Sequence, residues 1–239
     1  MKDIDEALAL GEIEFQWAEV HIVGCIKMRY YIADLHFFHE SLNKNMDKRG
    51  FGSAEEMNEY MIRQWNSKVR RNDDVVVLGD FSVGKGEETN EVLKRLNGRK
   101  FLITGNHDRF LEDRKFDEKL FHWIKPYEEL KDNKRKVILS HYPIFCYNGQ
   151  YRIGKDGKPK TYMLFGHVHQ TYDDMLVGKF IEITKNTSVV LPREEAERII
   201  PCQMINCFCK FSDYMPLTLD EWIEVDRKRR EGQKTLESV

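Results

Sequence analysis

Five short apolar runs mark the first two thirds of the chain, and each ends abruptly at residues that can bind a metal or act in catalysis. Runs of this length, rich in Val, Ile and aromatic residues, are typical of buried β-strands. The polar residues that follow therefore fall at the carboxyl ends of strands, where open α/β sheets place their ligand sites. The predicted strands cover residues 30–33, 75–78, 101–104, 137–140 and 163–165.

Amphipathic helices separate the first three predicted strands. Ser53 and Glu56 form a capping box, and apolar residues at helical spacing continue up to Arg70. A second helix is predicted over residues 87–97, with Gly98 as its C-terminal stop. This alternation is the order expected of crossover units that join parallel strands. The first half of the chain therefore predicts an α/β fold.

The second half of the chain predicts further strands and a last helix. Residues 180–183, and residues 203–211 with their alternation, indicate strands of a second sheet. Thr218 and Glu221 cap a helix that continues to about Arg230. No stretch rich in Pro, Gly or Ser marks a linker, so a single large domain is expected.

Met28 directly precedes the first strand and is the predicted start of this domain. We expect residues 28–231 to form the domain and residues 1–27 to be an N-terminal extension that packs as a helix plus an edge strand. Residues 232–239 are polar and are expected to form a frayed tail.

The composition narrows the classes of function and the compartment. The 239 residues are 41% hydrophobic and 33% charged, with a formal net charge of -2, which argues against a dedicated nucleic-acid binder. No apolar run reaches the length of a membrane span, and acidic residues near the N-terminus argue against a secretory signal. Five cysteines in a chain of this size predict a reducing, cytoplasmic setting. A zinc site built from Cys202, Cys207 and Cys209 is disfavoured because no matching second pair exists.

The residues that follow the predicted strands include five of the eight histidines in the chain. If these were ordinary core or surface residues, there would be no reason for so many of them to follow strands. The pattern therefore predicts a metal site at one edge of the sheets. Its members are Asp34, His36, Asp80, Asn106, His107, His141, His167 and His169.

The strings DLH (34–36), GD (79–80), GNHD (105–108), SH (140–141) and GHVH (166–169) resemble, in order and spacing, the calcineurin-like metallophosphoesterase superfamily. QWNSKV, LGDFSVG, LNGRKFLITGNHDR and SHYPI look like the smaller bacterial and phage members. The resemblance covers about residues 28–222. It implies an α/β fold in four layers, an α-β-β-α sandwich of two mixed sheets with flanking helices.

The resemblance also implies a centre that holds two divalent metal ions. A carboxylate can bridge two ions through its two oxygens, so Asp80 would be the shared ligand. Oxygen and imidazole ligands without a thiolate suit Mn²⁺, Fe or Zn²⁺, with Mg²⁺ as an alternative, and among these the resemblance favours Mn²⁺ or Fe. Carried over by position, one ion would be held by Asp34, His36 and His169, and the other by Asn106, His141 and His167.

In the chemistry that this resemblance implies, a hydroxide bridging the two metals attacks the phosphorus atom. His107 has no place among the ligands, so it would protonate the leaving alkoxide or steady the phosphate. Asp108 would orient the His107 imidazole from behind.

Four further residues are candidates for binding substrate: His39, Arg109, Tyr147 and Arg152. Each has an alternative role. His39 could be a plain surface residue, and Arg109 could pair with Glu112 or Asp113. Residues 146–160 form either a solvated hairpin or a loop over the substrate.

The sequence therefore predicts a metallophosphoesterase that hydrolyses phosphate monoesters or diesters, acting on a small molecule or a nucleotide without a membrane partner. A nuclease is the first alternative, but it needs a basic groove that the balanced charge does not suggest. The second is a non-catalytic protein-binding scaffold of the same fold. The complete set of ligands argues against it, because a scaffold has no physical need for them. The sequence leaves the oligomeric state open.

Overall fold

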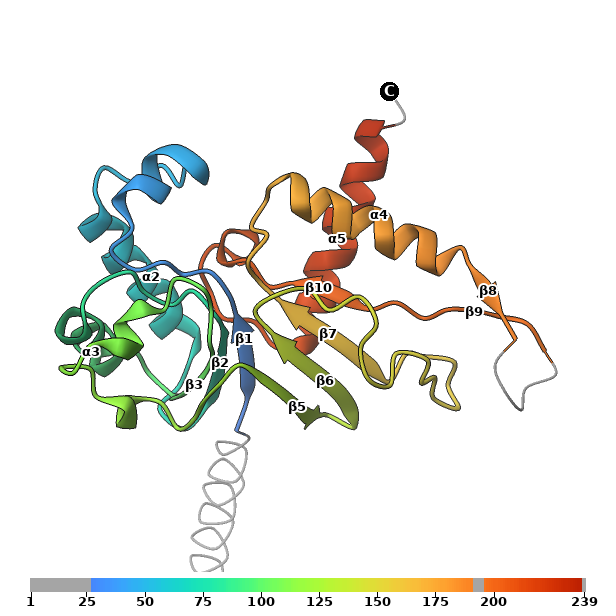
Figure 1. Cartoon of the computed structure of the whole chain (residues 1–239), viewed down its shortest axis with the longest axis horizontal. Coiled ribbons are helices and arrows are strands. Elements are labelled where there is room, and N and C mark those ends of the chain that lie inside the picture. The colour runs from blue at the N-terminus through green and yellow to red at the C-terminus, as the bar shows by residue number, and fades with distance from the viewer. Residues whose placement is uncertain (1–26, 191–195, 238–239) are drawn as a thin grey trace, which may run out of the picture.

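The computed structural model describes residues 27–190 and 196–237 (Figure 1). The predicted N-terminal extension at residues 1–27 therefore lies almost wholly outside the described residues. The first half of the domain contains β1 (Arg29–Ile32), η2 (Leu42–Met46), α2 (Ala54–Lys68), β2 (Asp74–Leu78), α3 (Gly86–Arg95), β3 (Arg99–Ile103), η3 (Arg109–Glu112), η4 (Glu118–Leu120) and β4 (Ile124–Lys125). The second half contains β5 (Tyr127–Asp132), β6 (Arg135–Ser140), β7 (Thr161–Phe165), α4 (Tyr172–Lys185), β8 (Ser188–Val189), β9 (Arg198–Ile199), β10 (Met204–Asn206), η5 (Cys209–Ser212) and α5 (Leu219–Glu237).

The helix predicted from Ser53 forms as α2. The Ser53 hydroxyl accepts a hydrogen bond from the Glu56 amide at 3.2 Å, which satisfies one of the free N–H groups of the first turn. Met57, Met61 and Trp65 recur at a spacing of four residues, and all three side chains are fully buried. The helix therefore forms where its cap and its apolar face were predicted.

The strands form two separate four-stranded sheets. The first has the order β1-β2-β3-β4, and its four named strands are all parallel, with helices α2 and α3 carrying the chain back over the sheet between β1, β2 and β3. The expectation that both sheets are mixed is therefore not met by the named strands of the first sheet, although Tyr31 of β1 also forms an isolated antiparallel bridge with Leu217. The second has the order β10-β7-β6-β5 and is mixed. Its antiparallel pair, β5 and β6, is joined by Asn133 and Lys134, whose φ angles of 45° and 63° match the turn that suits a tight hairpin.

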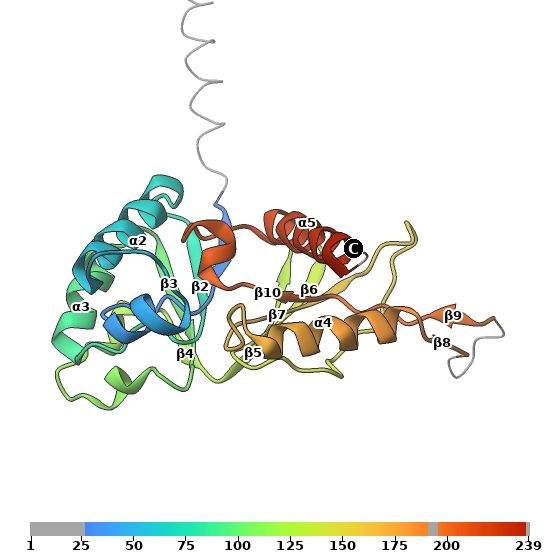
Figure 2. The ribbon, with the colours of Figure 1, turned by 90° about the horizontal axis from the view of Figure 1, so that it is seen from above.

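Successive side chains along each strand point to opposite faces of its sheet, and together the two sheets form three apolar clusters. On β1, Ile32 points toward α2 and α3, whereas Tyr31 points toward the second sheet. On β7, Leu164 faces the first sheet and Met163 faces α4. One cluster thus lies between the two sheets, and one lies under the helices on each outer side. Figure 2 shows helices α2 and α3 beside the first sheet and helix α4 beside the second. The protein is an α/β protein in which two sheets pack together and carry helices.

Residues 180–183, predicted as a strand, lie instead within helix α4. The Thr171 side chain caps this helix by accepting a hydrogen bond from the Asp173 amide at 3.3 Å. Val177 and Ile181 are buried four residues apart, which is a helical spacing. A short apolar run does not by itself distinguish a strand from a helix, and here the cap and the spacing decide.

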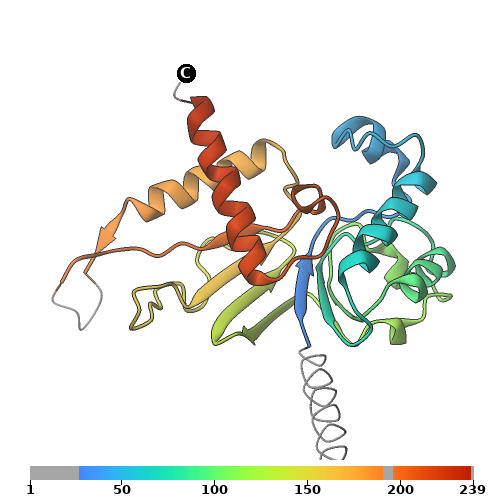
Figure 3. The same ribbon diagram turned by 180° about the vertical axis from the view of Figure 1, so that it is seen from behind.

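The strand predicted over residues 203–211 is cut short. Met204–Asn206 pairs as β10, and Phe208 adds an isolated bridge to Ala33. The Asn206 side chain accepts a hydrogen bond from the Phe208 amide at 3.1 Å and turns the chain. The last helix, α5, begins after Thr218 as predicted and extends beyond Arg230. It lies beside β1 and β10 (Figure 3), where Trp222 donates a hydrogen bond to the Tyr31 carbonyl at 2.8 Å. No helix in the described part of the chain is long and apolar enough to cross a membrane.

Candidate metal centre

The carboxyl ends of β1, β2 and β3 in the first sheet meet those of β6 and β7 in the second sheet. Backbone hydrogen bonds join neighbouring strand ends within each sheet: the Asp34 amide donates to the Gly79 carbonyl at 3.1 Å, and the Gly166 amide donates to the His141 carbonyl at 3.0 Å. Between the sheets, the His167 amide donates to Asp34 Oδ1 at 2.9 Å. This edge gathers seven of the side chains predicted from sequence: Asp34, His36, Asp80, Asn106, His141, His167 and His169.

Five of these seven residues adopt the left-handed backbone conformation that ordinary L residues avoid. Their φ angles lie between 46° and 69°. Such conformations cost free energy and persist where the surrounding structure holds them, often at functional sites. The backbone is thus bent at the strand ends so that the side chains face one another. The five residues are Asp34, His36, Asp80, His167 and His169.

Two glycines of the motifs allow the strand ends to approach this closely. Gly79 has a φ angle of 86°, and a Cβ atom there would lie 2.3 Å from His141 Nδ1. A Cβ atom at Gly166 would lie 2.7 Å from a carboxylate oxygen of Asp34. Any larger residue would displace a member of the site.

A buried group of two carboxylates and two imidazoles forms the first half of the site. Its four ligand atoms, from Asp34, His36, Asp80 and His169, all lie within 4.8 Å of one another. His36 Nε2 lies 3.4 Å from Asp80 Oδ2 and 3.2 Å from His169 Nε2, and His169 Nε2 lies 3.7 Å from Asp34 Oδ1. Four donor atoms converging in this way are arranged to hold one cation.

His141 lies at the centre of the other half of the site. Its Nε2 atom lies 3.5 Å from Asp80 Oδ2 and 3.0 Å from the Asn106 side-chain oxygen. The His167 ring lies 5.1 Å from the His141 ring between centroids. Asp80 Oδ2 therefore lies close to both His36 Nε2 and His141 Nε2, so this carboxylate joins the two halves of the site.

Comparison with protein families matches residues 30–198 to the model of the calcineurin-like phosphoesterases. The chain belongs to the calcineurin-like phosphoesterase family.

Three relatives and structures show how far this similarity extends. The uncharacterized protein MJ1445 of Methanocaldococcus jannaschii is 35% identical over 147 residues, which are 61% of this chain and 71% of that protein. The gene 66 protein of mycobacterium phage L5 is 29% identical over 168 residues, 59% of this chain and 76% of its own. A crystal structure of a protein of unknown function from Aquifex aeolicus, AQ665, aligns with a TM-score of 0.57 over 84% of this chain and 100% of its own, at 22% identity, which supports the fold.

The side chains present fit the divalent metals that calcineurin-like phosphoesterases bind. The ligand set contains only carboxylate, amide and imidazole groups, and the Nε2 atoms of His36 and His169 face each other at 3.2 Å. A cation between such groups would satisfy them together.

The charges of the site are matched in pairs. Burial disfavours the charged form of Asp80, but the hydrogen bond and charge of His141 outweigh it and lower the pKa of Asp80 to about 2. Burial likewise opposes the charged form of His141, but Asp80 and Asp34 outweigh it and raise the pKa of His141 to about 9. Burial lowers the pKa of His36 well below its ordinary value, so this imidazole is neutral and can donate its lone pair.

The remaining catalytic candidates lie beside the centre. His107 is exposed, its ring centroid lies 5.3 Å from that of His36, and its amide donates to Asp80 Oδ1 at 2.8 Å. Asp108 does not contact the His107 ring in the described residues. Its carboxylate instead accepts three backbone hydrogen bonds, from the amides of Asp80 at 3.0 Å, Phe81 at 2.7 Å and Gly105 at 2.8 Å. Asp108 therefore ties the loop after β2 to the loop after β3.

Of the four residues predicted to bind substrate, two lie near the centre and two lie far from it. His39 Nδ1 lies 3.3 Å from His36 Nδ1, so His39 borders the centre. Arg109 is exposed next to His107, and within the described residues it forms no ion pair with Glu112 or Asp113. That alternative account of Arg109 is wrong, because Asp113 accepts the Gly86 and Lys115 amides instead.

Tyr147 and Arg152 are not brought to the centre. Tyr147 is buried in the cluster under α4, and its hydroxyl accepts a hydrogen bond from the Gln203 amide at 2.7 Å. Arg152 lines a pocket with Lys136 and Lys160, at the start of β6 and β7, whereas His141 and His167 follow the ends of these strands. Residues 146–160 therefore do not cover the metal centre.

Two features of the site escaped prediction from the sequence. Tyr142 stacks edge-on against His167 at 4.5 Å and is 49% exposed beside the centre. Its position directly after a ligand in the SHYPI string was the available signal. Asp47 accepts a hydrogen bond from His169 Nδ1 at 2.8 Å, and no motif in the sequence marked it.

Proposed function

We propose that this protein is a metal-dependent hydrolase of phosphate monoesters or diesters that uses two divalent metal ions, most simply Mn²⁺ or Fe. One observation carries the proposal: Asp80 Oδ2, which lies 3.4 Å from His36 Nε2 in the buried group of ligands, also lies 3.5 Å from His141 Nε2, so the carboxylate joins the two halves of the site. The arrangement of the clusters and helices is also consistent with the four-layer sandwich expected of the family.

In this proposal Asp34, His36 and His169 hold one ion, Asn106, His141 and His167 hold the other, and Asp80 is shared. The ions would supply a water of lowered pKa and would neutralise the phosphoryl oxygens. The residues of the chain fix where this chemistry occurs. Left-handed backbone at five ligands and the three amide bonds to Asp108 hold the donor atoms in place before any ligand arrives.

His107 is proposed as the general acid. Its backbone is fixed by the hydrogen bond to Asp80, while its exposed ring reaches into solvent above His36, where a leaving group would depart. The imidazole would donate its proton to the leaving alkoxide oxygen. Arg109, exposed beside it without an ion-pair partner in the described residues, would bind a phosphoryl oxygen, and His39 would border the substrate.

The substrate is proposed to be a small phosphate ester or a nucleotide. The exposed ring of Tyr142 beside His167 offers a flat surface for the group attached to the phosphate. A cytoplasmic setting remains a prediction from the cysteine count; the four described cysteines, Cys146, Cys202, Cys207 and Cys209, are free thiols.

The test is hydrolysis of p-nitrophenyl phosphate and bis-p-nitrophenyl phosphate by metal-stripped protein before and after addition of Mn²⁺. We expect turnover that requires the metal and falls at least about 100-fold in Asp80→Asn and in His107→Ala. The preferred ester would separate monoesters from diesters.

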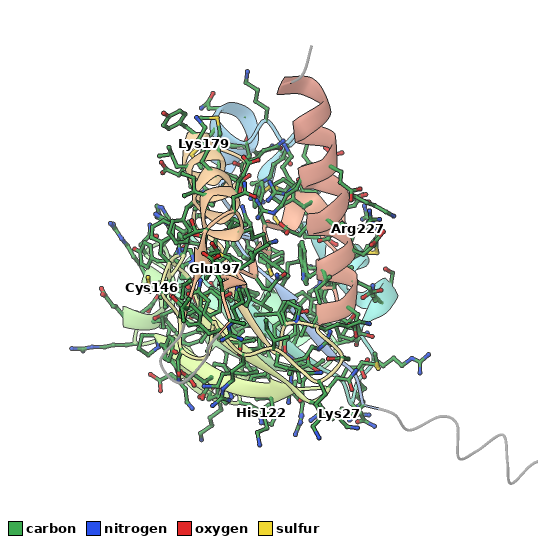
Figure 4. All side chains as sticks on the ribbon, turned by 90° about the vertical axis from the view of Figure 1, so that its right-hand side faces the viewer. Lys27, His122, Cys146, Lys179, Glu197 and Arg227 are labelled. Carbon is green, nitrogen blue, oxygen red and sulfur yellow. The ribbon has the colours of Figure 1, made fainter. Side chains whose placement is uncertain are left out.

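His122→Ala is the matched control for His107→Ala. His122 is also exposed, but it stacks on Phe101 at 5.2 Å between centroids and lies at the same end of the molecule as Lys27, away from the carboxyl ends of the strands (Figure 4). This control should keep full turnover. A wild-type protein that binds no Mn²⁺, or turnover that survives in Asp80→Asn, would contradict the proposal.

A further inference from the structure

A buried ion pair lies directly behind the metal centre. Asp47 and Arg49 belong to the segment between η2 and α2, and their side chains are 3% and 0% exposed. Arg49 donates to Asp47 Oδ2 from Nη2 at 2.9 Å and from Nε at 3.1 Å. The other oxygen of Asp47 lies 2.8 Å from Nδ1 of His169, a residue 122 positions away in the chain.

We propose that Asp47 and Arg49 are positioning residues that set the tautomer and the orientation of His169 and the bend at Asp34, and so determine how tightly one of the two metal ions is bound. This inference rests on the proposed function only in so far as the centre binds metal. It adds two residues that make no contact with substrate and that act through ligands.

Asp47 fixes which nitrogen of His169 carries the proton. A neutral imidazole has one N–H and one lone pair, and the hydrogen bond to the Asp47 carboxylate keeps the N–H at Nδ1. The lone pair is then at Nε2, which lies 3.7 Å from Asp34 Oδ1 and 3.2 Å from His36 Nε2. Without the carboxylate, the proton can move to Nε2 and block the ligand atom.

Other contacts hold the ring of His169 in place. Phe208 stacks on it at 4.7 Å with an angle of 25° between the planes. Asn206 donates a hydrogen bond to the His169 carbonyl at 2.7 Å. These groups fix the position of the ring but cannot choose its tautomer, so that choice falls to Asp47.

Arg49 links Asp47 to the first ligand loop. Its Nη2 donates to the Asp34 carbonyl at 2.8 Å, and its Nη1 donates to the Leu35 carbonyl at 2.6 Å. Asp34 has a φ angle of 57°, so its carbonyl needs a partner that holds this bend. The planar guanidinium is the only side chain that can bind a carboxylate and two carbonyls at fixed angles. Buried ion pairs contribute little net stability, so a role in geometry explains this pair better than a role in stability.

Among the described residues, the other half of the centre relies on the main chain instead of such an ion pair. His141 Nδ1 lies 2.9 Å from the Leu78 backbone carbonyl, so its tautomer is fixed by the main chain. A substitution at Asp47 should therefore weaken the ion that His169 holds and spare the ion that His141 holds. This asymmetry makes the inference testable.

The experiment is a calorimetric titration of the metal-stripped, full-length protein with Mn²⁺, together with ¹⁵N NMR of the histidine side chains in the metal-free state. In Asp47→Ala we expect one of two binding steps to weaken about 10- to 100-fold and the other to change less than about twofold. The His169 nitrogen shifts should move from one tautomer to a mixture. Asp47→Asn keeps an oxygen that can accept from Nδ1, so it should restore most of the affinity and the tautomer.

Asp74→Asn is the matched control. Asp74 is also 3% exposed and ion-paired, with Lys27 at 2.7 Å and Arg99 at 2.7 Å, but it lies at the start of β2, at the opposite end from the centre. Its substitution should lower the unfolding temperature without changing either binding step.

Equal weakening of both steps in Asp47→Ala, or unchanged affinity with an unchanged tautomer, would overturn the inference. If the wild-type protein binds two Mn²⁺ ions and hydrolyses neither ester, the proposed function fails while the titration still decides the role of Asp47. If the wild-type protein binds no Mn²⁺, the proposed function fails, and an unchanged His169 tautomer in Asp47→Ala would overturn the positioning role as well.

Discussion

Asp108 offers a sharp test of how the site is held, because the structure gives it a different role from the one that its sequence position suggested. In GNHD it follows His107 and was expected to orient that imidazole. The carboxylate instead accepts amide hydrogen bonds from Asp80, Phe81 and Gly105. Asp108→Asn removes one acceptor oxygen at almost constant volume.

The cost of Asp108→Asn follows from these three bonds. The amide oxygen can still serve the Asp80 and Gly105 amides, but the new NH₂ group then faces the Phe81 amide. One charge-assisted bond is lost and one buried donor is left without a partner, which together cost about 3 kcal/mol. For a chain of this size the unfolding temperature should fall by roughly 6–12 °C.

Thermal and urea unfolding of metal-free protein measure this cost, and Asp113→Asn is the control. Asp113 also accepts two backbone amides, Gly86 at 2.8 Å and Lys115 at 3.0 Å, but in contact with water, so its substitution should cost less than about 1 kcal/mol. Native stability in Asp108→Asn, with turnover reduced to the level of His107→Ala, would refute this reasoning and restore the role of orienting His107.

Three further outcomes are expected. The pKa of His141 is raised to about 9 in the folded protein, so its contribution to the stability of the metal-free protein is complete below its unfolded pKa near 6.5 and is lost as the pH rises through 9. Urea unfolding should show that the free energy of unfolding falls by up to about 3 kcal/mol over this range. His141→Gln should not show this fall. In Gly166→Ala the new Cβ would lie 2.7 Å from an oxygen of Asp34. Calorimetry should therefore show loss of Mn²⁺ binding, and urea unfolding should show that the protein is less stable by about 1–3 kcal/mol. Arg109→Ala should raise KM about tenfold with an unchanged unfolding temperature; an unchanged KM would remove Arg109 from the substrate site.

The strands of the fold could be predicted from the sequence because they are buried on both faces. β2 is buried at all five positions and after Asp74 its sequence is a continuous apolar run, which stops where the polar ligands begin. Asp34, Asp80 and the histidines could be found for the same reason, since each follows such a run. The sheet pairing could not, because it depends on contacts between residues far apart in the chain.

The errors also have physical causes. Residues 180–183 form a short apolar run that by itself looks like a strand, but they belong to a helix that buries one apolar stripe. The signal for this helix is its cap at Thr171, well before the run. Asp47 lies in a polar segment with no periodicity, and its role depends on His169, 122 positions away. Tyr147 and Arg152 follow a ligand strand in sequence, but the chain between them leads away from the centre and back to the start of β7.

The five left-handed ligands have a consequence for stability. At about 1 kcal/mol or more each, their conformations cost an amount comparable to the lower range of whole-protein stability, and the buried carboxylates add to it. A bound ion offsets this cost because it binds the folded arrangement alone. Mn²⁺ at about 100 times its Kd should therefore add about 2.7 kcal/mol and raise the unfolding temperature by roughly 5–11 °C. Asp80→Asn should abolish this increase, because it changes the ligand that we propose both ions share. Equal unfolding temperatures for metal-free and Mn²⁺-treated wild-type protein would mean that the bent strand ends are stable on their own and serve some purpose other than binding metal.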